Sequence, residues 1–306
     1  MAVSRAKLVT LDQIEQRIVV YERTGAIDPT DAKQLRIQVH PDLWPCDQER
    51  ARSLFARIGN IGNRKKITIG RYTLGPIIGS GDVADCYLDD LKDVVIKVSR
   101  EADGLKSIKR EYDLLQSIQT TGIYCNCIPV PLEQLAIKDT VKKGVAIYGY
   151  HKTYTLREIV TEHHNISPRH IVWMFRRLMT CLGYIHQQGL CHGAVTPENI
   201  VFSVEQHTGG LVGYTHAQKI GKRLVSGSAN YIAWYPDNKT AKPYIDTSMA
   251  ARSLLDLTNL PQPIERLLRS MLVSSCDAFE MNDEMGRVAC EVYGKPTFLP
   301  LTMTER

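Results

Sequence analysis

The stretch HGAVTPENIVF, residues 192–202, is the feature that most constrains the fold of this chain. It directly follows the longest helical pattern in the sequence, RHIVWMFRRLMTCLGYIHQQG (169–189), whose apolar residues recur at helical spacing on one face. Gly189 marks the end of that helix, because glycine readily takes the backbone conformation that follows a helix C-terminus. The sequence therefore predicts a long amphipathic helix that leads straight into a polar loop.

This loop resembles the catalytic loop of protein kinases, H-R-D-L-x-x-x-N. The residues that match the kinase pattern are His192, Pro197, Glu198 and Asn199. Two positions depart from it, because Ala194 stands where kinases carry the catalytic aspartate and Gly193 stands where they carry an arginine. Alanine has no side-chain acceptor, so it cannot position the hydroxyl group that receives the phosphoryl group.

Two upstream segments resemble the nucleotide-binding half of the same family. The segment IIGSGDVADCY (77–87) is similar to the glycine-rich loop, with Gly79 and Gly81 at its first two glycines. The segment VVIK (94–97) is similar to the V-A-I-K strand, which makes Lys97 the expected phosphate-contacting lysine. Glu111, in the helical stretch that follows, is the expected carboxylate partner of Lys97.

Downstream, GGLVGYTHA (209–217) aligns with the L-V-D-F-G segment of kinases. Gly213 replaces the aspartate that binds Mg²⁺, and it offers no ligand atom. Tyr214 and Thr215 replace the phenylalanine and the glycine, and Asp246 matches the buried aspartate that begins a later helix. The resemblance covers roughly residues 70–275.

Together these departures predict a pseudokinase, with no catalytic residues and with Ala194 and Gly213 as its degenerate positions. ATP binding, if it occurs, is expected to be weak or independent of Mg²⁺, because Val95 replaces the alanine that packs on adenine. The residues expected to hold ATP are Gly79, Gly81, Lys97, Glu111 and Asn199. No metal site is expected. One alternative is an atypical ATP-binding kinase or nucleotidyl or phosphoryl transferase that uses the remaining polar residues. A small-molecule phosphotransferase is disfavoured by the same two substitutions.

The amino-terminal part contains the tripeptide His40, Pro41 and Asp42. It resembles the HPD loop of J-domains, the co-chaperone module that stimulates the ATPase of DnaK-type chaperones. Lys33 and Arg36 precede it, and an A-x-x-x-F-x-x-I helical pattern follows. The resemblance implies that these five residues bind a DnaK-type chaperone. The alternative is a plain helical hairpin in which Pro41 ends one helix and Asp42 caps the turn.

The tripeptide is expected in an exposed loop between helices at about 30–39 and 46–59, because proline cannot continue a helix. Apolar stripes are expected to pack across this hairpin, with Leu35 and Val39 facing Phe55 and Ile58. J-domain-like and kinase-like segments in one chain resemble uncharacterised proteins of bacteria and phages.

The expected fold is α+β: a bilobal protein kinase-like fold preceded by an N-terminal helical, J-domain-like hairpin. The expected boundaries are 1–62 for the helical segment, 63–70 for a linker, 71–150 for the small lobe and 151–306 for a reduced large lobe. The sequence has no long apolar run and a net charge of only +5, so neither a membrane span nor nucleic-acid binding is expected. Scattered cysteines without metal or disulfide spacing favour a cytoplasmic protein.

Overall fold

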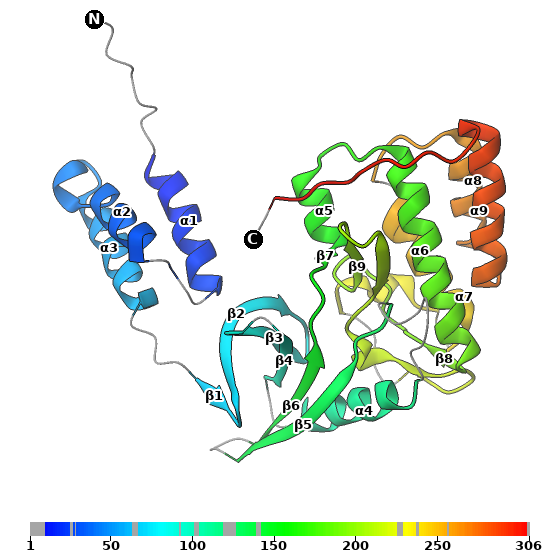
Figure 1. Cartoon of the computed structure of the whole chain (residues 1–306), viewed down its shortest axis with the longest axis horizontal. Coiled ribbons are helices and arrows are strands. Elements are labelled where there is room, and N and C mark those ends of the chain that lie inside the picture. Colours follow the sequence, from blue (N-terminus) through cyan, green and yellow to red (C-terminus); the bar gives the residue numbers. More distant parts are fainter. Residues whose placement is uncertain are drawn as a thin grey trace, which may run out of the picture.

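The computed structural model describes residues 10–24, 27, 29–62, 67–91, 93–100, 104–118, 127–138, 142–224, 229–236, 239–255 and 257–304. Its helices and strands form an N-terminal helical unit, a curled antiparallel sheet and a larger helical part (Figure 1). This mixture confirms the α+β prediction. None of the helices in the described ranges is both long and apolar enough to cross a bilayer.

The helical unit has its own core. Its elements are α1 (Leu11–Thr24), α2 (Pro29–Gln38), the short 3-10 helix η1 (Pro41–Leu43) and α3 (Gln48–Gly62). The apolar positions of these elements recur at helical spacing, and the buried set is Leu11, Ile14, Ile18, Leu35, Val39, Leu54, Ile58 and Ile61. Because this cluster is separate from the other two cores, the unit has a hydrophobic interior of its own.

The expected pairing of Phe55 with this core is wrong. Leu54 and Ile58 point inward from α3, which turns Phe55 toward the surface, where 37% of it is exposed. Its ring instead meets the edge of the His40 ring, with the two ring centroids 6.1 Å apart. The hairpin itself is present, since α2 ends at Gln38 and α3 begins at Gln48 with His40 and Asp42 exposed between them.

The small lobe is a sheet whose six described strands have the order β1-β2-β3-β4-β6-β5. The strands are β1 (Thr68–Ile69), β2 (Tyr72–Ser80), β3 (Ala84–Asp89), β4 (Val94–Ser99), β5 (Pro131–Lys138) and β6 (Lys142–Gly149). Helix α4 (Gly104–Gln116) packs against this sheet, chiefly along β6. Within the predicted linker, residues 63–66 lie outside the described residues and the rest forms β1 and its turn.

The larger part is built around α6 (Pro168–Gln187), half of whose residues are buried. The other helical elements are α5 (Leu156–Glu162), η3 (Tyr214–His216), η4 (Ala229–Trp234), α7 (Pro243–Leu255), α8 (Gln262–Ser270) and α9 (Ala278–Tyr293). Its short strands form a three-stranded sheet of β7 (Tyr154–Thr155), β9 (Ile200–Ser203) and β10 (Thr208–Leu211), and a two-stranded sheet of β8 (Leu190–Cys191) and β11 (Gln218–Lys219). The loop after α6 runs from β8 to β9, so the helix and these strands position it.

Candidate functional site

Lys97, Glu111 and Thr215 meet in a buried polar cluster between the two lobes. The Lys97 ammonium on β4 donates to Glu111 Oε2 on α4 at 2.6 Å and to Thr215 Oγ1 at 3.0 Å. The Thr215 hydroxyl in turn donates to Glu111 Oε2 at 2.6 Å. Burial opposes the charged form of Lys97, but the Glu111 charge outweighs it and raises the pKa of Lys97. The lysine is therefore cationic and already held by two partners.

Thr215 is fixed from its backbone side as well. The Arg110 guanidinium on α4 donates a hydrogen bond to the Thr215 carbonyl oxygen. Tyr148, on β6 beside Val95, donates from its hydroxyl to Glu111 Oε1 at 3.3 Å. Sequence reasoning noted that Thr215 replaces a glycine, but it missed both this network and the part that Tyr148 plays in it. The sequence signal for this network was the hydroxyl of Thr215 at a position where the family pattern has glycine.

Gly213, two residues before Thr215, lies against the side chain of Asn199. The backbone of Gly213 is left-handed, with φ 77° and ψ 46°. A Cβ atom at this position would stand 2.3 Å from Asn199 Oδ1, which is far inside van der Waals contact. Asn199 is itself fixed by two hydrogen bonds. Its side-chain Nδ2 donates to the Ala194 carbonyl at 3.0 Å, and its backbone carbonyl accepts from Val212 N at 2.9 Å. The site thus has no room for a side chain at position 213.

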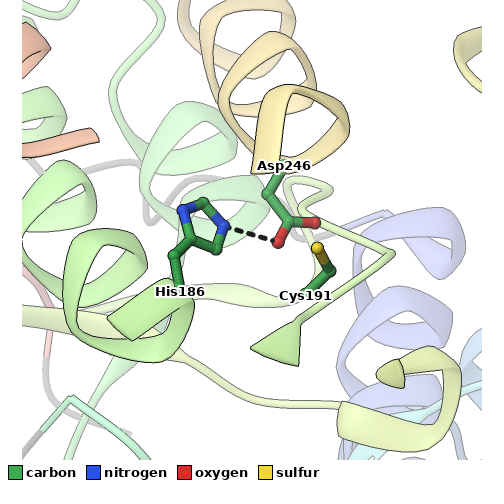
Figure 2. Close-up of side chains that lie close together, drawn as sticks. All are labelled: His186, Cys191 and Asp246. Atoms are coloured by element: carbon green, nitrogen blue, oxygen red, sulfur yellow. Dashed lines mark hydrogen bonds and ion pairs between the residues drawn. The ribbon is translucent and has the colours of Figure 1, made fainter. Parts of the chain in front are cut away.

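Asp246 anchors the loop that carries Ala194. Its carboxylate is fully buried at the start of α7 and accepts backbone N–H bonds from His192 and Gly193, both at 2.8 Å. His186, at the end of α6, lies 3.0 Å away through Nε2 (Figure 2). The His192 side chain contacts the Val212 carbonyl at 2.9 Å through Nε2. These bonds tie the loop to α6, α7 and the Gly213 segment.

His186, Cys191 and Asp246 also form a compact set of donor atoms, all within 4.8 Å of one another (Figure 2). The chemistry of the set favours a hydrogen-bonded anchor over a metal site. Burial and the charge of Asp246 raise the pKa of the Cys191 thiol, which holds it in the protonated form that metals bind poorly. The carboxylate oxygens are already engaged by the His192 and Gly193 amides.

The glycine-rich segment is an ordinary hairpin turn between β2 and β3. A Cβ atom at Gly79 or Gly81 would make only an ordinary van der Waals contact, with the nearest atoms at 3.8 Å and 3.7 Å. Asp85 lies at its base, where the Arg100 guanidinium contacts it at 2.8 Å. Burial opposes ionisation of Asp85, but hydrogen bonds from Arg100 and Ser80 outweigh it and lower the pKa of Asp85. The ionised Asp85 and the cationic Arg100 therefore form an ion pair at the base of this turn, and their opposite charges largely cancel.

The HPD tripeptide forms a second candidate site at the tip of the helical unit. His40 caps η1, and its Nδ1 atom lies 3.4 Å from Asp42 Oδ2. A surface hollow of about 370 Å³ lies beside it, lined by His40, Pro41, Asp42, Gln48, Arg52, Phe55 and Ala56. Lys33 and Arg36 are exposed, and the Arg36 guanidinium lies 5.9 Å from the centre of the Phe55 ring. The tip therefore combines positive charge with an exposed aromatic ring.

The structure thus groups the predicted residues into distinct places. Lys97 and Glu111 meet at Thr215. In the loop between β8 and β9, Asn199 binds the Ala194 carbonyl and lies against Gly213, which comes two residues before Thr215. Gly79 and Gly81 lie in the β2–β3 turn. The five residues predicted to bind a partner lie in the helical unit, on α2 and in the turn after it.

Comparison with known proteins gives distant relatives. No protein-family model matches the chain. The chain is 25% identical over 228 residues to a Dictyostelium discoideum protein named "Probable serine/threonine-protein kinase glkA", covering 71% of this chain and 42% of that protein. It is 26% identical over 212 residues to a probable myosin light chain kinase of the same organism, covering 64% of this chain and 50% of that protein.

The chain therefore spans about half the length of the curated relatives it matches. Both relatives are named as kinases, and the similarity extends over about two thirds of this chain. This distant homology supports a protein kinase-like domain, in agreement with the order of the motifs along the sequence.

Proposed function

We propose that this chain is a pseudokinase: a kinase-fold protein without phosphotransfer activity that acts as a scaffold or regulator. The observation that carries the proposal is the contact between Gly213 and Asn199. Position 213 has neither a metal-binding side chain nor room for one, and Asn199 is held by the Ala194 carbonyl. Mg²⁺-ATP does not fit this site, since a divalent ion needs several oxygen ligands.

The state of Lys97 supports the same proposal. In an active kinase this lysine contacts nucleotide phosphates. Here its ammonium is engaged by Glu111 and Thr215. A phosphate group would have to compete with Thr215 for Lys97.

One observation favours the second candidate, an atypical nucleotide-dependent transferase. The Lys97–Glu111 pair is intact at 2.6 Å, and such a buried ion pair is costly to keep unless something uses it or holds it. Thr215 and Tyr148 supply that holding role through their hydrogen bonds, which is why we prefer the pseudokinase.

Nucleotide binding gives a direct test. We expect ATP to raise the melting temperature by no more than about one degree, with or without Mg²⁺, because stabilisation by a ligand grows only as RT ln(1 + [L]/Kd). Val95→Ala should enlarge the shift, since Val95 crowds the place of the adenine ring. Differential scanning fluorimetry measures it.

The matched control is Val98→Ala, which removes the same methyl groups from the opposite face of β4, where Val98 packs against the sheet core. Val98→Ala should leave the ATP shift unchanged. A large shift in the wild-type protein that requires Mg²⁺ would contradict the steric argument and favour the transferase.

We further propose that the helical unit is a J-domain-like arm that recruits a DnaK-type chaperone. The arm has its own core, and its tip exposes His40 and Asp42 beside the cations Lys33 and Arg36. Positive charge of this kind fits an acidic partner surface.

The chaperone proposal predicts that the full chain accelerates ATP hydrolysis by a DnaK-type chaperone several-fold. His40→Gln should abolish the acceleration, because it removes the imidazole that caps η1 and faces Phe55. His164→Gln, which alters an exposed histidine of the larger part, should have no effect. If wild type and His40→Gln are equally inert in a steady-state ATPase assay, the tripeptide is only a helix-hairpin turn.

A further inference from the structure

A groove on the larger part shares no lining residue with the sites described above. Its lining residues come from α6, from α9 and from the segment that follows α9. The helices α6 and α9 pack side by side (Figure 1). Its volume is about 260 Å³. Pockets that enclose small-molecule ligands are usually larger, about 300–1,000 Å³, so the groove suits a few side chains of an extended partner.

The groove has one sign of charge. The residues that line it include four cations, Arg169, Arg176, Arg177 and Lys295. They include no aspartate or glutamate. Within the described residues, none of the four has a carboxylate within ion-pair distance. Arg169 donates to Thr297 Oγ1 at 2.8 Å and Arg176 donates to Asn282 Oδ1 at 2.9 Å, so even their hydrogen-bond partners are neutral.

The rest of α9 shows that this charge is confined to the groove. On the outer side of the helix, Arg287 forms ion pairs with Glu284 and Glu291, both at 2.5 Å. On the groove side, α9 has the small residues Gly286, Ala289 and Cys290 between Asn282 and Tyr293, and a Cβ at Gly286 would stand 3.3 Å from Arg176 Cζ. The absence of a side chain at Gly286 therefore lets the Arg176 guanidinium lie across α9.

The wall of the groove contains two buried polar groups and lies beside an aromatic surface. The Trp173 indole nitrogen and the Tyr293 hydroxyl are buried in the wall without a hydrogen-bond partner among the described residues. Next to Trp173 lies the ring of His207, with centroids 4.7 Å apart, and beyond it Phe298, which is 73% exposed. An apolar side chain can pack on this aromatic surface while acceptors meet the cations.

We propose that this groove is a docking site for an acidic peptide segment of a partner protein, one that carries glutamate or aspartate around an apolar residue. Four cations without acidic partners repel one another, and carboxylates entering the groove would relieve that repulsion. The exposed Phe298 ring supplies the apolar contact that a purely ionic patch would lack. The proposal is independent of whether the site around Lys97 binds nucleotide.

The test uses the full chain and a fluorescein-labelled synthetic peptide of glutamates around a central leucine, measured by fluorescence anisotropy. We expect binding that weakens as salt is raised. The double variant Arg177→Glu with Lys295→Glu should weaken it at least about tenfold, because charge reversal adds repulsion to the lost attraction. Both side chains are exposed, and neither forms an ion pair with a described residue.

The matched control is Lys106→Glu with Arg266→Glu, which changes the net charge equally at exposed positions on α4 and α8. It should bind like wild type. Bound peptide should also protect the exposed Cys290 of the groove from alkylation, while the exposed Cys46 of the helical unit reacts as before.

Three results would overturn the proposal. The first is no binding by wild type at millimolar peptide, and the second is equal binding of a peptide with glutamines in place of the glutamates. The third is displacement of the peptide by a single-stranded RNA of similar length at much lower concentration, which would assign the groove to nucleic acid instead.

Discussion

Replacing Asp246 by alanine is expected to lower the free energy of unfolding by about 3–5 kcal/mol, measured by urea denaturation. The carboxylate is fully buried and accepts hydrogen bonds from His192 N and Gly193 N while facing His186 (Figure 2). Alanine would leave two buried N–H groups without an acceptor, and each such group costs about 1–3 kcal/mol. The loop of residues 192–199, which these hydrogen bonds hold, should become less ordered in this variant.

Two further variants make this prediction specific. Asp277→Ala removes an exposed aspartate that caps α9 through Phe279 N and Glu280 N, and it should cost only about 1 kcal/mol. Asp246→Asn keeps one acceptor oxygen, so its cost should fall between the two. If Asp246→Ala were no more harmful than Asp277→Ala, the anchoring role of the buried carboxylate would be wrong.

Restoring an aspartate at position 213 is expected to destabilise the protein by about 3 kcal/mol or more and to restore no activity. Gly213 has φ 77°, a conformation that costs an L-residue about 1–2 kcal/mol. A Cβ there would also stand 2.3 Å from Asn199 Oδ1, so Asn199 would have to break its bond to the Ala194 carbonyl. Thermal and chemical unfolding of Gly213→Asp measure the effect.

Gly189→Asp is the matched control, because Gly189 has φ 75° and nothing within 4 Å of an added Cβ. It should cost only the backbone term, about 1–2 kcal/mol. Combining Gly213→Asp with Asn199→Ala should cost less than the sum of the single variants, because the second change removes the clash. Equal losses for Gly213→Asp and Gly189→Asp would show that Asn199 does not block the site.

Much of this arrangement could be predicted from the order of local patterns. The periodic apolar residues of 169–189 predicted α6, and the proline within the HPD tripeptide predicted the break between α2 and α3. The partnership of Lys97 with Glu111 was expected from the family resemblance, and the two side chains lie 2.6 Å apart.

Other features depend on how segments meet in space. Phe55 matched a core pattern, but the exact rotation of α3 put Leu54 and Ile58 inward instead. The bond from Thr215 to the Lys97–Glu111 pair joins residues more than a hundred positions apart, and the basic groove exists only because α6 and α9 lie together. Neither follows from periodicity or from a local motif.

The central claim, a kinase-like fold without phosphotransfer, is tested most directly by incubating the purified full chain with γ-labelled ATP, Mg²⁺ or Mn²⁺, and generic protein substrates. The missing carboxylates at Ala194 and Gly213, together with the engagement of Lys97 by Thr215, predict no transfer above background to itself or to any substrate. Lys97→Met, checked for folding by its melting temperature, is the control for contaminating kinases. Robust transfer by the wild-type protein that disappears in Lys97→Met would contradict the account.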